Sequence, residues 1–367
     1  MVQHKENKEF RILSAIGIIL VAAGHLGYNL FDVGGLFPYY SFHVFIFLFV
    51  SGYFYKKESQ EHMVSYLRGK CVTLLLPYFV WNLFYGIVTM LLHKAGFTIG
   101  QDLSLYTLFV APFEGGHQFM YQFPAWFVPA LFMVEAVNVC MRKVLSLLHL
   151  DYEWLIFAGC LLLGMATVLL AAGGHVWGYY KIPGRVLFML PGFQMGRIYK
   201  EKLEKHDNLS NGLYFLIVMG IQLLLVANCG GLAFSAVWVT SFANGPVIPY
   251  LTVITGIAFW LRAAKIIKDI PYFSGKLTDI GRNTYAIMMH HIFAFFLVKA
   301  VFYLVHCFTP LCADFDTAMF FSDVNFVFLL NGVEAGKWIY LAAGIGIPMI
   351  IGKGEAKVKD RIRKRFD

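Results

Sequence analysis

The chain has 367 residues, 59% of them hydrophobic, with a mean hydropathy of +0.64 and a formal net charge of +8. Soluble domains of this length are rarely so apolar, and the apolar blocks recur along the whole chain, so the composition excludes an ordinary soluble protein. We therefore predict one integral-membrane domain over residues 1–367. The positive charge needs no nucleic-acid partner, because most Lys and Arg residues lie in short loops between apolar segments.

Ten apolar segments are predicted to cross the membrane, because about 20 helical residues span the hydrocarbon core. The predicted fold class is all-α, a polytopic transmembrane helix bundle of about ten spans. The second and sixth segments are short, and we expect them to be tilted or partly re-entrant. The first is too long for the apolar part of a cleaved signal peptide, so we expect it to be retained. The segments are 12–31, 40–55, 72–92, 124–141, 153–172, 184–199, 212–229, 245–262, 283–305 and 337–352.

The loops between these segments alternate in charge. One set of alternate loops, together with the two ends of the chain, holds 25 of the 30 Lys and Arg residues. Loops rich in Lys and Arg remain in the cytoplasm, so the pattern predicts an even number of spans and two cytoplasmic termini. Residues 353–367 are predicted to form a basic cytoplasmic tail. Membrane lipids are expected partners of these loops, because anionic headgroups attract basic segments.

The cysteines and the known short motifs give little support to metal or nucleotide chemistry. The six cysteines show no CxxC or Cys/His spacing, so no metal site is predicted. Cys307 and Cys312 share one predicted outer loop, where a disulfide would form only on an oxidising side. The chain has no GxSxG, Walker or GxGxxG motif.

The first predicted span carries His25, and an ionisable group inside a membrane is costly unless it lines a cavity or a pathway. At ~1.5 Å per residue, His25 lies about 20 Å from the cytoplasmic end of the segment. Asn29 and Asp32 follow four and seven positions later, so a continuous helix would place all three on one face. Either could orient the imidazole. The alternative is a neutral histidine that only bonds to a neighbouring helix.

More polar residues mark the cytoplasmic ends of the second and third spans. Ser51 and Gly52 precede Tyr53, and a pair of small residues allows helices to approach closely. Arg68 and Lys70 lie where the third span begins. They either reach lipid headgroups or bind phosphates.

The fourth and ninth spans also contain polar residues. Trp126 is predicted at the outer interface, where aromatic belts are common, whereas Glu135 lies deeper and needs a partner or a proton. Glu135 therefore belongs either to a structural ion pair or to the lining of a cavity. His290 and His291 are adjacent, about 100° apart on a helix, so at most one of them points straight into a given cavity.

These segments, in this order, resemble the membrane-bound acyltransferase family 3. The resemblance covers nearly the whole chain and rests on six motifs, each weak alone and fairly specific as an ordered set. The motifs are "ILVAAGHLG", "FIFLFVSGYF", a basic entry into "LLLPYFVW", "AWFVPALF", "MLPGFQMGRIY" and "GRNTYAIMMHHIF".

The resemblance implies a membrane enzyme that transfers an acyl group other than an aminoacyl group. The implied donor is cytoplasmic acetyl-coenzyme A, with no metal. The implied acceptor is a hydroxyl of a cell-envelope or exported glycan, or of a lipid-linked sugar. The implied location is the plasma membrane, as a multi-pass protein of a bacterium.

The resemblance also assigns residues. The family's catalytic histidine corresponds to His25, as a base or as an acyl carrier. Residues expected to support it or to line the route to it are Asn29, Asp32, Ser51, Tyr53, Trp126, Glu135, Tyr285 and His291. Residues expected to hold the coenzyme are Arg11, Arg68 and Lys70. The family often has an arginine eleven positions before the histidine, where this chain has Ser14; Arg11 lies about 4.5 Å away along the helix.

Two other functions remain open at this stage. A transporter or flippase without covalent chemistry also carries polar groups near the midplane and broken helices. The departure at Ser14 is compatible with a sensor or interaction domain on an acyltransferase scaffold that has lost its chemistry.

Overall fold

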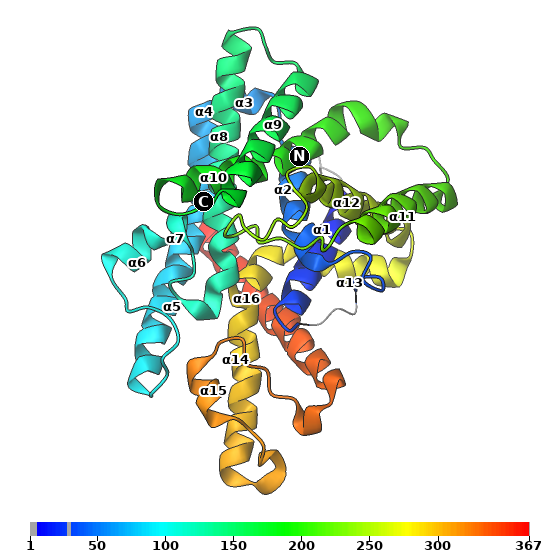
Figure 1. Ribbon diagram of the computed structural model, residues 1–367. Helices are drawn as coiled ribbons and strands as arrows, with labels where there is room; N and C mark the ends of the chain where they lie inside the picture. The colour runs from blue at the N-terminus through cyan, green and yellow to red at the C-terminus, as the bar shows by residue number, and fades with distance from the viewer. Residues whose placement is uncertain (1–5, 28–30, 367) are drawn as a thin grey trace.

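The computed structural model describes residues 6–27 and 31–366, and across them it is all-helical, as predicted (Figure 1). Each predicted span overlaps a helix, although the bounds differ. The α-helices are α1 Lys8–Gly24, α2 His43–Phe54, α3 Glu58–Glu61, α4 Met63–Lys70, α5 Leu76–Lys94, α6 Leu105–Phe109, α7 Ala111–Glu114, α8 Phe127–Leu147, α9 Glu153–Ala172, α10 Lys181–Ile198, α11 Asn211–Asn228, α12 Ile248–Ile267, α13 Pro271–Arg282, α14 Thr284–Phe308, α15 Thr317–Ser322 and α16 Lys337–Phe366. Two other helical segments matter below: the π-helix η2 (Cys71–Leu75) and the 3-10 segment η3 (Met120–Trp126).

Seven helical stretches in the described part of the chain are long and apolar enough to cross a membrane. The other three predicted spans correspond to α1, α2 and α10. Of these, α2 has only 12 residues, which agrees with the short second segment expected from the sequence. The total of about ten spans and the cytoplasmic placement of both termini remain predictions. The seven stretches are Met63–Lys94, Met120–Leu147, Glu153–Ala172, Asn211–Asn228, Ile248–Ile267, Thr284–Phe308 and Glu334–Val358.

Cysteine labelling tests this topology at two exposed positions. In a chain whose exposed cysteines Cys71, Cys140 and Cys307 are replaced by serine, we expect Asp102→Cys to react with an impermeant maleimide in intact cells. Lys205→Cys should react only after the cells are opened, because its loop belongs to the basic set. Labelling of Lys205→Cys in intact cells would reverse the predicted orientation.

The first helix begins and ends earlier than the sequence suggested. It ends at Gly24, with His25 as its C-cap, and Gly27 adopts a φ of 58° that turns the chain. Glycine adopts this left-handed conformation without a steric penalty, so the "GHLG" stretch ends the helix. The prediction that Asp32 shares a helix face with His25 is therefore wrong. Asn29 lies outside the described residues.

Helices α1, α2 and α10 form the interior of the bundle. Most residues of α1 are buried, and α2 and α10 cross with their backbones in contact. A Cβ atom on Gly52 would lie 1.8 Å from the Phe193 carbonyl oxygen, and one on Gly196 would lie 1.9 Å from that of Phe49. Gly52 therefore has the packing role predicted for the small pair, because only glycine allows this approach.

Gly52→Ala should therefore lower the unfolding temperature in detergent. Overpacking a core typically costs about 1–3 kcal/mol, and a backbone oxygen cannot rotate away as a side chain can. The matched control is Gly220→Ala in α11, where an added Cβ meets no atom within 4 Å. A Gly52→Ala protein that unfolds at the wild-type temperature would contradict the contact.

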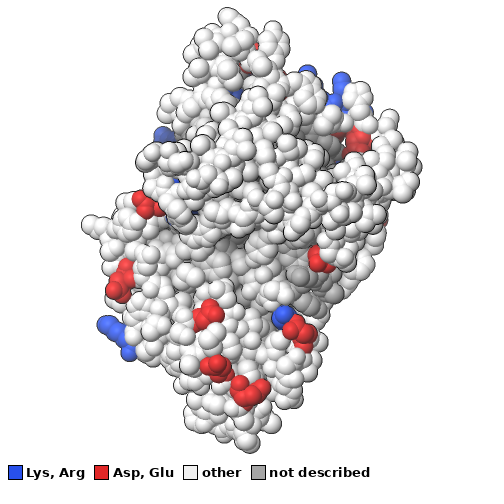
Figure 2. All heavy atoms as spheres, viewed as in Figure 1, with Lys and Arg blue, Asp and Glu red and all other residues white. Residues whose placement is uncertain are grey.

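The outer helices present apolar side chains to the surroundings, as membrane-spanning helices do. Only 17% of the apolar window of α11 is buried inside the protein, compared with 61% of the window in Met120–Leu147, which contains η3 and α8. Figure 2 shows large areas of one face without charge, with mostly acidic groups in the lower part and mostly basic groups along the upper margin. The distribution suits a bundle surrounded by lipid.

Candidate active site

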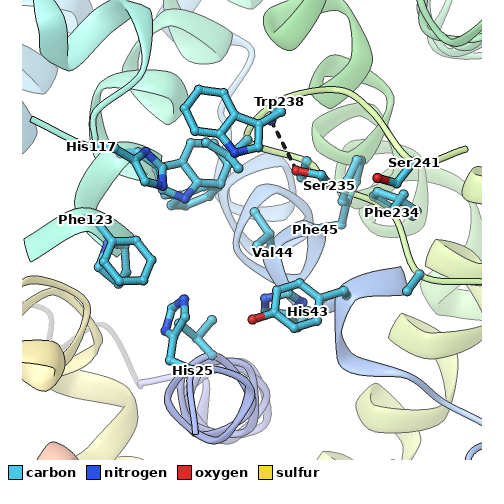
Figure 3. A pocket seen from close by; sticks show the side chains of 18 of the residues that line it. His25, His43, Val44, Phe45, His117, Phe123, Phe234, Ser235, Trp238 and Ser241 are labelled. Atoms are coloured by element: carbon cyan, nitrogen blue, oxygen red, sulfur yellow. Dashed lines mark hydrogen bonds between the residues drawn. The ribbon is translucent and has the colours of Figure 1, made fainter. Parts of the chain in front are cut away.

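Loops and helix ends from distant parts of the chain enclose a cavity of about 530 Å³ around His25. Figure 3 shows His25 reaching from the end of α1 into the space between Phe123, His117 and His43. The cavity walls come from the start of α2, the segment before and within η3, and the loop between α11 and α12. All of these lie in, or next to, loops predicted on the outer side of the membrane. Lining residues used below are His25, His43, His117, Phe123, Trp126 and Trp238.

His25 is held by His291 of α14, so the structure brings together two residues predicted for the site. His25 Nδ1 lies 2.9 Å from His291 Nε2, and His291 Nδ1 lies 2.7 Å from the Ile287 carbonyl oxygen. His291 is fully buried, whereas His25 is half-buried beside the cavity. Helix α14 therefore positions the imidazole of His25 through a second imidazole.

The hydrogen bonds determine which nitrogen carries the proton in each neutral ring. A carbonyl oxygen only accepts, so His291 Nδ1 donates to Ile287 and His291 Nε2 is left as an acceptor. His25 Nδ1 then donates to His291 Nε2, and the lone pair of His25 lies on Nε2. This is the arrangement that general-base catalysis requires: an imidazole in a fixed tautomer with its basic nitrogen free to accept a proton.

Two more histidines of the cavity are oriented in the same way. His43 Nδ1 bonds to the Tyr39 carbonyl oxygen, and His117 Nδ1 lies 2.9 Å from the Gly115 carbonyl oxygen. Each is therefore a donor at Nδ1 and an acceptor at Nε2. The ring of His117 lies between Phe123, at 5.3 Å, and Trp238, at 4.8 Å.

His290, the neighbour of His291 on α14, has its partners elsewhere. Its Nδ1 bonds to Tyr85 Oη at 2.8 Å, and its ring packs edge-on against Trp81 of α5. The two neighbouring histidines of α14 thus serve different surroundings, as their helical spacing predicted. Among the residues that the structure describes, no group of His, Cys, Asp and Glu could hold a metal ion.

The residues predicted to hold the coenzyme fall into two separate groups. Lys70 Nζ pairs with Glu135 Oε1 at 2.8 Å, and Glu135 is only 1% exposed, so the ion-pair interpretation of Glu135 is the one observed. Arg68 is exposed two positions before Lys70 on α4. Arg11 instead pairs with Glu6 at 3.1 Å, and Glu6 also pairs with Arg282, the last residue of α13.

A groove of about 390 Å³ runs along α3, α4 and η2 on the predicted cytoplasmic side. Lys56, His62 and Lys70 line it, with Glu58 as its one acidic lining residue, so its basic groups outnumber the acid and suit phosphate groups. The groove and the outer cavity share no lining residue.

The remaining predicted residues lie around these two cavities or away from them. Trp126 lines the outer cavity. Tyr285 lies on α14, six positions before His291, and its Oη is 3.4 Å from the carbonyl oxygen of Leu74 in η2. Tyr53 donates to Glu204 Oε1 at 2.8 Å at the other end of α2 from His43. Ser51 is half-buried beside it, and Asp32 lies in the turn after α1.

Comparison with known proteins identifies the family. A family model described as an acyltransferase domain matches residues 7–345, nearly the whole chain. The chain belongs to the membrane-bound acyltransferase family 3. No curated protein and no solved structure gives a significant match.

The acyltransferase contains site residues that its sequence did not reveal. His117 and Trp238 come from loops, where no periodic pattern marks a buried face. His43 was visible as a histidine near the outer edge of a span, but nothing indicated that it faces the same cavity as His25. All six cysteines are free, so Cys307 and Cys312 are not paired.

Proposed function

We propose that the protein transfers an acetyl group from cytoplasmic acetyl-coenzyme A to a hydroxyl of a glycan, or of a lipid-linked sugar, at the outer face of the membrane. The observation that carries this proposal is the free Nε2 of His25 beside a cavity on the predicted outer side, with the ring held through His291. Acetyl-coenzyme A supplies the acetyl group as a thioester, which needs no metal to activate it.

His25 acts in this proposal as the base. Its Nε2 accepts the proton of the acceptor hydroxyl while the hydroxyl oxygen forms the new ester bond. The same proton then passes from Nε2 to the departing sulfur, so the histidine returns to its starting state. His291 accepts from Nδ1 throughout and stabilises the imidazolium that forms between the two steps.

The donor is proposed to bind in the groove along α3, α4 and η2. Lys56, Lys70 and the neighbouring Arg68 supply positive charge for its phosphates. Tyr285 contacts η2 beside this groove and lies on the same helix as His291, about 9 Å from it along the axis at 1.5 Å per residue. Helix α14 therefore connects the surroundings of the groove with the ring that holds His25.

Purified protein incubated with acetyl-labelled coenzyme A and deacetylated glycan from the producing cells tests the proposal. We expect one free coenzyme thiol for each labelled ester formed. A flippase would move the glycan across a vesicle membrane and leave the thioester intact, and that result would overturn the proposal.

Arg68→Ala is expected to raise the KM for acetyl-coenzyme A about ten-fold or more, since a hydrogen bond to a charged group is worth about 1.5–3 kcal/mol. Lys70→Ala alone would leave the buried Glu135 carboxylate unpaired, so the informative variant combines Lys70→Ala with Glu135→Gln. The control is Lys276→Ala, an exposed lysine of α13 in another basic segment. Donor KM values equal to that of the control would show that these cations only set the topology.

A further inference from the structure

Lys181, the first residue of α10, holds a positive charge beside the rim of the outer cavity. Its Nζ lies 4.9 Å from the centroid of the Trp177 ring and 4.4 Å from that of Trp238. Trp238 also lines the cavity that contains His25. Two indole faces thus fix the ammonium group where the cavity meets the predicted outer side.

The charge of Lys181 has no ion-pair partner among the described residues, because no carboxylate oxygen there lies within 4 Å of its Nζ. Glu114 is the acid whose charge acts on Lys181, but its carboxylate accepts a hydrogen bond from Tyr106 Oη at 2.5 Å. Lys181 is one of only five Lys and Arg residues outside the basic cytoplasmic segments. Topology therefore does not explain a lysine at this position.

A second cation follows one turn further along the same face of α10. Arg185 is 1% exposed, and its Nη2 donates to the Phe113 carbonyl oxygen. Its Nε and Nη1 are buried without a hydrogen-bond partner among the described residues. The guanidinium lies 5.5 Å from the ring centroid of Trp126, which lines the cavity. This wall therefore carries a second positive charge, and Arg185 has no ion-pair partner within the described residues.

A continuous aromatic surface connects Lys181 with His25. The Trp238 ring lies 4.8 Å from His117, the His117 ring 5.3 Å from Phe123, and the Phe123 ring 4.9 Å from His25. Figure 3 shows Trp238, His117, Phe123 and His25 around the same space. Apolar and aromatic walls with a few fixed polar groups are typical of sites that bind and orient an organic ligand.

We propose that the acceptor is an anionic glycan. Its carboxylate or phosphate group binds Lys181 while a hydroxyl further along the glycan reaches Nε2 of His25. The positive potential added by Arg185 favours the same anion from behind Trp126. This inference rests on the proposed acetyl transfer, because it assigns the substrate class of that same cavity.

The test uses glycan from the producing cells, first freed of esters by mild alkali. Three forms are compared as acceptors with saturating labelled acetyl-coenzyme A: the intact glycan, a carboxyl-reduced form and a dephosphorylated form. The wild-type enzyme should transfer at least ten-fold less label, at equal low concentration, to the form that has lost the anion. The affected form identifies carboxylate or phosphate as the recognised group, and equal transfer to all three forms would overturn the inference.

Lys181→Gln and Lys181→Arg provide the residue-level test. With intact glycan, Lys181→Gln should raise the acceptor KM about ten-fold and leave the donor KM within two-fold of wild type, whereas Lys181→Arg should retain most of the affinity. The form without the anion should not distinguish Lys181→Gln from wild type. If Lys181→Gln weakens acceptor binding equally with every form of the glycan, or with none, Lys181 does not bind the anion. A wild-type enzyme that labels no form at all would overturn the proposed transfer, and this inference with it.

Discussion

Replacing His25 with asparagine is expected to lower the rate of acetyl transfer by about 10²–10⁴-fold, the usual contribution of a general base. Asparagine can keep a hydrogen bond to His291 but cannot accept a proton near neutral pH. If His25 instead carries the acetyl group covalently, the loss will be larger. Donor binding should change little, because the proposed groove for the donor lies along α3, α4 and η2.

The matched control for this variant is His290→Asn. His290 lies on the same helix as His291 and is buried as deeply as His291, but its partners are Tyr85 and Trp81. Initial rates at saturating donor and acceptor, compared at equal amounts of folded protein, decide the outcome. Equal losses in the two variants would indicate general damage to the bundle and no special role for His25.

The second large effect is expected at His291, a positioning residue that acts through His25. In His291→Leu no group accepts the Nδ1 proton of His25, so the basic lone pair is no longer held on Nε2. Loss of the group that sets the tautomer costs about 10⁴ in kcat in a serine protease, and we expect a fall of at least about 10²-fold here. His291→Gln can offer an amide oxygen to the same proton and should recover part of the rate.

The comparison between these two variants separates positioning from packing. Both should keep the donor KM and the unfolding temperature near those of the wild type, with the difference confined to kcat. If His291→Gln is as inactive as His291→Leu although both are folded, the hydrogen bond to His25 is not what matters at this position.

The seven long apolar helices could be predicted from the sequence because lipid imposes a length and a polarity on every helix that faces it. Three predicted spans, α1, α2 and α10, are not among these seven helices. They are the interior helices, which contact protein more than lipid. Glycine is tolerated in these helices because they are held by close packing against neighbouring helices, as at Gly52, and need not present a long apolar surface to lipid.

The central histidine could also be predicted, since a buried ionisable group in a span stands out against its apolar neighbours. Its surroundings could not. Asp32 was expected beside His25 from helical spacing, but the helix ends at Gly24. The observed contact with His291 joins residues 266 positions apart, and local periodicity carries no information about such a contact.

The loops were the hardest part to predict. His117 and Trp238 belong to segments without regular structure, and only tertiary packing brings them to one cavity.

The ion pair between Lys70 and Glu135 was easier to predict. A carboxylate deep in a span needs a partner, and a basic residue lay where a neighbouring helix begins.

In the proposed function, His25 catalyses the transfer of an acetyl group from a cytoplasmic donor to an acceptor at the outer face. Sealed inside-out vesicles from producing cells test it most directly, with labelled acetyl-coenzyme A added to the exposed cytoplasmic face. We predict labelled glycan that resists an added esterase until detergent opens the vesicles, and no such label in vesicles containing His25→Asn protein. Label that the esterase removes from closed vesicles, or equal label with His25→Asn, would contradict the account.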